Sequence, residues 1–100
     1  MPRNTTSAVF HYVYALESLK DNKRYIGYTA NLKRRLMEHS NGEGFSTAPR
    51  RPFRLIYFEG CLNAVDAKRR ERYLKTTQGR RFLGLRIKNY GRLLKFGSGS

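Results

Sequence analysis

The sequence contains few of the residues that build disulfides, metal clusters or carboxylate-rich sites. Its one cysteine, Cys61, cannot form an internal disulfide and fits a reducing compartment. One cysteine and two histidines cannot make a closed four-ligand zinc site. Only seven residues are acidic, which argues against a centre that holds two metal ions between several carboxylates.

Long apolar runs are also missing. No stretch approaches the length that crosses a membrane, and no basic head followed by an apolar segment suggests a signal peptide. We therefore expect a cytoplasmic protein that is not inserted in a membrane. With 100 residues, of which 39% are hydrophobic, the chain predicts one domain with a single core over residues 8–95, between flexible termini at 1–7 and 96–100.

Positive charge is abundant and spread along the chain. The sequence has 21 Lys and Arg against seven acids, which gives a formal charge of +14 and a pI near 10.6. A compact domain with this much self-repulsion is typical of proteins that bind a polyanion, because basic side chains attract phosphates and release their counterions. Charge alone does not separate DNA from ribosomal RNA or an anionic membrane surface.

Three runs of β-branched and aromatic residues predict strands, at residues 9–16, 25–29 and 53–58. Asp21 and Asn22 lie in a turn-like segment, residues 18–23, which predicts that the first two strands pair as an antiparallel hairpin.

Helices are predicted after two good N-cap residues. Asn31 precedes a helix that ends at Asn41 and Gly42, and Asn63 precedes one that ends near Lys75. Residues 79–94 mix basic and apolar side chains and predict a third helix, weakened by Gly84. Residues 41–52 read as a loop.

The hairpin brings tyrosines together. Tyr12 and Tyr14 share one face of the first strand, and the turn places Tyr14 diagonally near Tyr25. A free phenol has a pKa of about 10, and nearby cations or a metal favour its phenolate, which is a base. Aromatic packing with a hydroxyl hydrogen bond explains any one of these tyrosines equally simply.

The first helix carries two reactive side chains on its apolar side. Arg35 and His39 are four residues apart and lie beside Leu32 and Leu36. They are candidates for a site that faces the sheet. The alternatives are a snorkelling arginine and a histidine that caps the end of a helix.

Glu71 is the most unusual acid of the second half. It continues the stripe of Ala67 and Leu74, so we expect it to face inward, where a carboxylate needs a partner or a metal. One carboxylate with water molecules suffices for Mg²⁺. The alternative is an ion pair with one of the neighbouring arginines. The cations that we expect to contact DNA are Lys33, Arg34, Arg50, Arg51 and Arg69.

These pieces, in this order, resemble the GIY-YIG nucleases, and most closely the small stand-alone bacterial members related to the N-terminal domain of the excinuclease. The matching segments are residues 12–14 (Tyr-Val-Tyr), 25–35 (Tyr-Ile-Gly-Tyr-Thr-Ala-Asn-Leu-Lys-Arg-Arg), 50–52 (Arg-Arg-Pro) and 67–76 (Ala-Lys-Arg-Arg-Glu-Arg-Tyr-Leu-Lys-Thr). The resemblance covers about residues 12–90. It implies an α/β (α+β) fold, with a small three-stranded antiparallel sheet flanked by about three helices.

The resemblance also implies roles for the residues of the site. Tyr14 and Tyr25 match the two motif tyrosines, and one of them would be the general base. Arg35 would neutralise the phosphate, and His39 would assist proton transfer. Glu71 would hold a single Mg²⁺ or Mn²⁺ ion.

Other positions differ from the family pattern or leave it open. Gly27 would permit close backbone approach. Tyr12 stands where the first motif has glycine, which leaves Tyr14 intact. The family's C-terminal site asparagine has two candidate counterparts, Gln78 and Asn89.

The function implied is that of a metal-dependent DNA endonuclease in DNA repair or recombination, with branched or damaged DNA among the candidate substrates. Two alternatives remain at this point. One is a catalytically weak DNA-binding module, and the other, suggested by charge alone, is an RNA-associated basic protein.

Overall fold

A three-stranded antiparallel sheet forms the centre of the protein in the computed structural model, which describes residues 8–43 and 47–97. The strands are β1 (His11–Ser18), β2 (Arg24–Thr29) and β3 (Phe53–Cys61), in the order β2-β1-β3. The predicted sheet and its β1–β2 hairpin are confirmed, and β1 is the central strand.

The helices follow the predicted caps. They are α1 (Leu32–Asn41), α2 (Ala64–Leu74), α3 (Thr77–Arg86) and α4 (Lys88–Gly97), with a short 3-10 helix, η1 (Ala48–Arg50), before β3. The Asn31 side chain accepts from the Arg34 amide, and the Asn63 side chain accepts from the amides of Val65 and Asp66. Within the described ranges, no helix is long and apolar enough to span a bilayer.

The prediction of one helix over residues 79–94 is wrong. Thr76 caps a helix that begins at Thr77, and the break comes at Ile87, not at Gly84. Ile87 leaves the helical conformation, with φ −118° and ψ 35°, and packs against the core. Burial of this side chain therefore decides where the chain turns. α4 then continues to Gly97, so residues 96 and 97 of the expected tail are helical, and residues 1–7 and 98–100 lie outside the described part.

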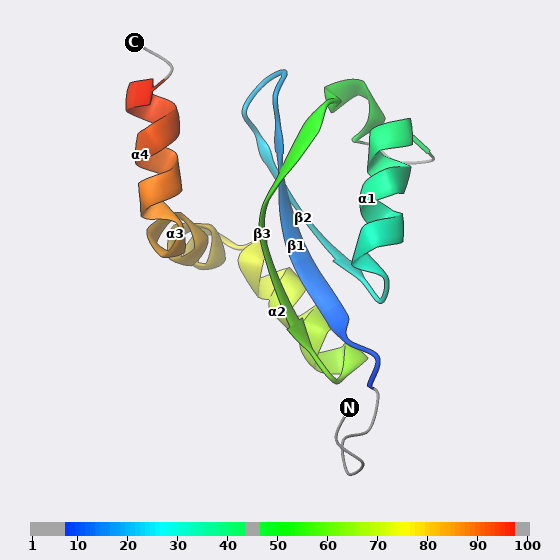
Figure 1. The fold of residues 1–100 in the computed structure, drawn as a ribbon. Helices are drawn as coiled ribbons and strands as arrows, with labels where there is room; N and C mark the ends of the chain where they lie inside the picture. Colours follow the sequence, from blue (N-terminus) through cyan, green and yellow to red (C-terminus); the bar gives the residue numbers. More distant parts are fainter. Residues whose placement is uncertain (1–7, 44–46, 98–100) are drawn as a thin grey trace, which may run out of the picture.

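The two faces of the sheet are covered by different helices (Figure 1). Because side chains alternate along a strand, Val13 and Ala15 point to one face and Tyr14 and Leu16 to the other. Val13 and Ala15 form the main core with residues of α2 and α3: Ala67, Leu74 and Leu83. α1 lies on the opposite side, over the face that carries Tyr14.

A buried carboxylate fastens α4 to the sheet. Glu17, on the core face of β1, is only 3% exposed. Tyr90 of α4 donates its hydroxyl hydrogen to the Glu17 carboxylate at 2.7 Å, and Arg24 lies 3.5 Å from the other carboxylate oxygen. A buried acid needs such partners, so this contact orients the C-terminal helix.

Tyr90→Phe removes the hydroxyl and leaves one oxygen of Glu17 without its donor. We expect the free energy of unfolding to fall by about 1–3 kcal/mol, because a buried acceptor is left unsatisfied. Urea unfolding measures this loss. Tyr73→Phe is the control, because among the described residues the Tyr73 hydroxyl has no hydrogen-bond partner; equal losses in the two variants would contradict the role of Glu17.

Candidate active site

Tyr14 reaches its position by lying across a glycine. Tyr14 of β1 pairs with Gly27 of β2, and a Cβ atom at Gly27 would collide with the Tyr14 ring and hydroxyl. The space over Gly27 is therefore filled by Tyr14. This corrects the expectation that Gly27 admits an approaching backbone, because its missing side chain makes room for the tyrosine of the neighbouring strand.

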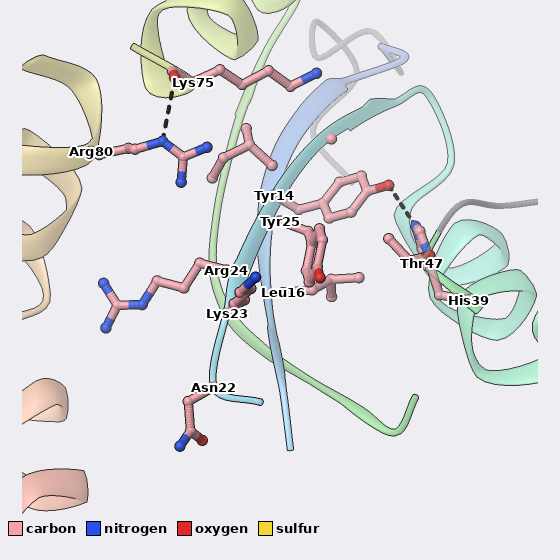
Figure 2. Close-up of a pocket in the computed structure, with 12 residues that line it drawn as sticks. Tyr14, Leu16, Asn22, Lys23, Arg24, Tyr25, His39, Thr47, Lys75 and Arg80 are labelled. Carbon is pink, nitrogen blue, oxygen red and sulfur yellow. Dashed lines mark hydrogen bonds between the residues drawn. The ribbon is translucent and has the colours of Figure 1, made fainter. Parts of the chain in front are cut away.

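The Tyr14 hydroxyl joins the sheet to α1 through His39. The hydroxyl lies 2.9 Å from His39 Nε2, and the two rings meet edge to face (Figure 2). On its other side, His39 Nδ1 lies 3.0 Å from Thr47 Oγ1. All three residues are buried. Since a phenol is a stronger donor than an alkyl hydroxyl, we assign the tautomer in which Tyr14 donates to Nε2 and Nδ1–H donates to Thr47.

Thr47 is a residue that the sequence analysis missed. It stands in a segment that reads as an ordinary loop, and nothing in its spacing marks it. It reaches His39 because the chain returns toward the end of α1 before η1 and β3. The Ser18 hydroxyl of the hairpin supports this return by donating to the Arg50 carbonyl at 2.7 Å.

Burial sets the protonation of both rings. It raises the pKa of the Tyr14 phenol above its ordinary value of 10.0, against the opposing effect of Arg35. It also lowers the pKa of His39 below 6.5, and Arg35 lowers it further while Glu38 raises it. The expectation that nearby cations make Tyr14 a free phenolate near neutral pH is therefore wrong, because desolvation outweighs them. A neutral phenol faces a neutral imidazole.

Arg35 lies close to this pair, as its spacing from His39 predicted. Its charge acts on both Tyr14 and His39. The guanidinium is about one-third exposed and lies 3.7 Å from a carboxylate oxygen of Glu38. It therefore places positive charge beside the Tyr14 hydroxyl while remaining accessible to solvent.

Tyr25 shares the Tyr14 face and lines the same cavity. Its ring packs edge to face on Phe53 at 5.6 Å. Among the residues that the structure describes, the Tyr25 hydroxyl has no hydrogen-bond partner. Tyr14, and not Tyr25, is thus the tyrosine coupled to a histidine.

The cavity, of about 810 Å³, opens at the β2 edge of the sheet. Four cations line it that the sequence analysis did not select: Lys23, Arg24, Lys75 and Arg80. In Figure 2, Lys75 and Arg80 lie across β2 from His39 and Thr47. Arg80 donates to the Lys75 carbonyl at 3.3 Å. Gly79 permits this approach of α3, because a Cβ atom there would collide with the Tyr73 carbonyl of α2.

Glu71 is partly buried on α2, as predicted, but its partner is a lysine. The side chain is 21% exposed, and its carboxylate lies 3.3 Å from Lys75 Nζ, so the expectation of an arginine partner is wrong. Glu71 does not line the cavity wall, although its charge raises the pKa of Tyr14 and so acts at the site.

One carboxylate can hold one hard cation. No group of three or more His, Cys, Asp or Glu side chains comes together in the described ranges. That donor chemistry fits Mg²⁺ or Mn²⁺, which keep several water ligands, better than zinc. Glu71 is the residue that would hold such an ion.

The five cations expected to contact DNA, Lys33, Arg34, Arg50, Arg51 and Arg69, lie elsewhere on the surface, and none of them lines the cavity. Arg51 binds the carbonyls of Ala48 and Ser40, so it fastens the loop. Arg69 pairs with Asp66 at 2.9 Å. Gln78 and Asn89, the two candidates for the family asparagine, are both exposed and also lie outside the cavity.

Thr47→Val tests the assigned tautomer. Without Oγ1, His39 Nδ1–H loses its acceptor, so we expect the parent to show the Nδ1–H tautomer alone and the valine variant to show a mixture. The nitrogen chemical shifts of the His39 ring, measured by NMR at neutral pH, distinguish the two. Thr47→Ser keeps the hydroxyl and is the control. An Nε2–H tautomer in the parent would contradict the assignment.

The comparisons agree with this geometry. A family model described as the GIY-YIG catalytic domain matches residues 10–83. The chain is 44% identical over 66 residues to UPF0213 protein CPE1444 of Clostridium perfringens, which covers 65% of this chain and 70% of the relative. It is 43% identical over 67 residues to UPF0213 protein SH2523 of Staphylococcus haemolyticus, covering 66% and 80%.

A solved structure shares the fold. The solution NMR structure of the UPF0213 protein BH0048 from Bacillus halodurans superposes with a TM-score of 0.51 at 34% identity, over 78% of this chain and 85% of that one. The sequence motifs, the matched catalytic-domain model and the shared fold lead to one conclusion: this chain belongs to the GIY-YIG family.

Proposed function

We propose that this protein is a DNA endonuclease that hydrolyses phosphodiester bonds with the help of one divalent metal ion. The observation that carries the proposal is the 2.9 Å hydrogen bond between the Tyr14 hydroxyl and His39 Nε2, at the wall of a cationic cavity. Membership of a nuclease domain family supports the reaction type. The resemblance to the excinuclease supports a place in DNA repair or recombination.

The Tyr14–His39 pair supplies the base. As the oxygen of an attacking water bonds to phosphorus, the water proton passes to the Tyr14 oxygen and the Tyr14 proton passes to His39 Nε2. The proton ends on the imidazole, the Tyr14 phenol is restored, and the P–O bond to the leaving oxygen breaks. The lowered pKa of His39 keeps it neutral and able to accept at pH 7. Thr47 holds the ring at the start of this step.

Positive charge serves the phosphate. Arg35 lies beside Tyr14, where it neutralises the phosphoryl oxygens as their charge grows. Lys75 and Arg80 line the same cavity and bind the backbone on the far side of β2. Glu71 would hold Mg²⁺ or Mn²⁺, and such an ion supplies further charge to the phosphoryl and leaving oxygens.

Tyr14→Phe and Tyr25→Phe distinguish the two tyrosines. Removing the Tyr14 hydroxyl breaks the relay, so single-turnover cleavage should fall about a hundredfold or more, while the equivalent change at Tyr25 costs far less. Both variants keep their rings and should keep most of their thermal stability.

The pH profile gives a second readout. The parent rate should rise as His39 loses its proton, below pH 6.5, and stay level from about pH 7 to 9, because Tyr14 does not ionise there. Single-turnover rates on single-stranded, duplex, flap and four-way-junction DNA, with and without Mg²⁺ or Mn²⁺, supply the measurement. Full activity of Tyr14→Phe, or no cleavage of any substrate by the parent, would refute the proposed function.

Glu71→Gln tests the metal assignment. It removes one negative charge and leaves side-chain volume unchanged, so cleavage should fall at least about a hundredfold while DNA affinity stays equal or rises slightly. Asp66→Asn, an exposed acid on the same helix, is the matched control and should remain active. Equal rates for Glu71→Gln and the parent would remove Glu71 from the reaction.

A further inference from the structure

Three aromatic rings form an open row on the sheet, and the proposed reaction uses none of them. Phe10 precedes β1, Tyr12 lies on β1 and Phe58 on β3. The Phe10 and Tyr12 ring centroids are 6.4 Å apart, and those of Tyr12 and Phe58 are 6.2 Å apart. Phe10 is 45% exposed and Phe58 is 52% exposed, an unusual position for large apolar rings. We call these three residues the aromatic row.

The aromatic row begins next to the candidate active site. Tyr12 and Tyr14 are two residues apart on β1, so their side chains leave the same face of the sheet. Phe58 is the direct partner of Tyr14 on β3, and Gly60, the partner of Tyr12, adds no side chain there. From Tyr14 the surface therefore runs both ways, to the cationic cavity at β2 and to the aromatic row at β3.

A groove of about 500 Å³ separates part of the aromatic row from the start of α1. Tyr12 and Phe58 form one wall, and the exposed Lys33 lies on the other with Leu32 and Leu36. The groove thus offers ring faces and a cation together. A second copy of this chain is a poor occupant, because it would bring one charge of +14 against another.

We propose that the aromatic row binds unpaired bases of a single DNA strand that leads away from the scissile phosphate. Aromatic side chains beside cations are the chemistry of single-strand binding, since every base has a face that stacks on a ring. Paired bases keep their faces inside the duplex. The inference rests on the proposed function and deepens it, because it makes a strand with unpaired nucleotides the preferred substrate class.

Binding without metal tests the inference apart from cleavage. Fluorescence anisotropy in EDTA compares a labelled oligodeoxythymidine with an abasic oligonucleotide of the same length, which has the same phosphates and no bases. We expect the parent to prefer the oligodeoxythymidine, and Phe58→Ala to weaken that binding about tenfold while leaving the abasic strand unaffected. The slope of affinity against salt should not change, since no phosphate contact is lost.

Two further variants control for other causes. Leu85→Ala removes an exposed apolar side chain from α3, 66% exposed, and should bind like the parent. Phe58→Leu keeps apolar bulk without a flat ring, so it should bind weakly too, with the thermal midpoint of the parent confirming that it is folded. Base-independent binding by the parent, or an equal loss for both oligonucleotides, overturns the inference.

Two other results are informative. Sedimentation that shows a dimer in the parent and a monomer in Phe58→Ala would make the row a contact between copies of the chain and overturn the inference. Base-dependent binding without cleavage of any DNA would refute the proposed endonuclease and retain the row. Cleavage without base-dependent binding would do the reverse.

Discussion

The hydrogen bond between Tyr14 and His39 joins the two layers from which the site is made. Tyr14 comes from the central strand and His39 from the last turn of α1, so the bond forms only when helix and sheet are docked. It also needs the open space above Gly27 and the Thr47 hydroxyl on the far side of the imidazole. Burial of this assembly is what keeps both rings neutral, and neutral rings can pass a proton at the pH of the cell.

The few acids of the chain hold cations and helices in place. Three of them have basic or hydroxyl partners from other elements or from the next helical turn: Glu17 with Tyr90 and Arg24, Glu59 with Arg70, and Glu71 with Lys75. A polyanion therefore meets a surface on which positive charge dominates, while the proton-transfer groups are uncharged. Arg35 connects the two features, because its charge lowers the pKa of His39 and so helps keep it neutral.

Sheet order explains how distant segments meet at one edge. β1 is central, and β2 is an outer strand with α1 on one face of the sheet and α2 and α3 on the other. Side chains from both faces can therefore converge around β2: His39 from α1, and Lys75 and Arg80 from the opposite side. The close approach at Gly79 completes this wall. The β3 side of the sheet, by contrast, carries exposed rings and one groove next to α1.

The sequence by itself determined the local elements and the motif residues. Alternation placed Tyr14 and Tyr25 on one face, Asn31 and Asn63 fixed the helix starts, and spacing placed Arg35 beside His39, because these depend on neighbours along the chain. Tertiary structure decided the rest. Thr47 and Arg80 reach the cavity through turns that no local pattern encodes, the break at Ile87 follows burial, and desolvation outweighs nearby charge at Tyr14. Those effects depend on what packs around a residue, which local sequence does not specify.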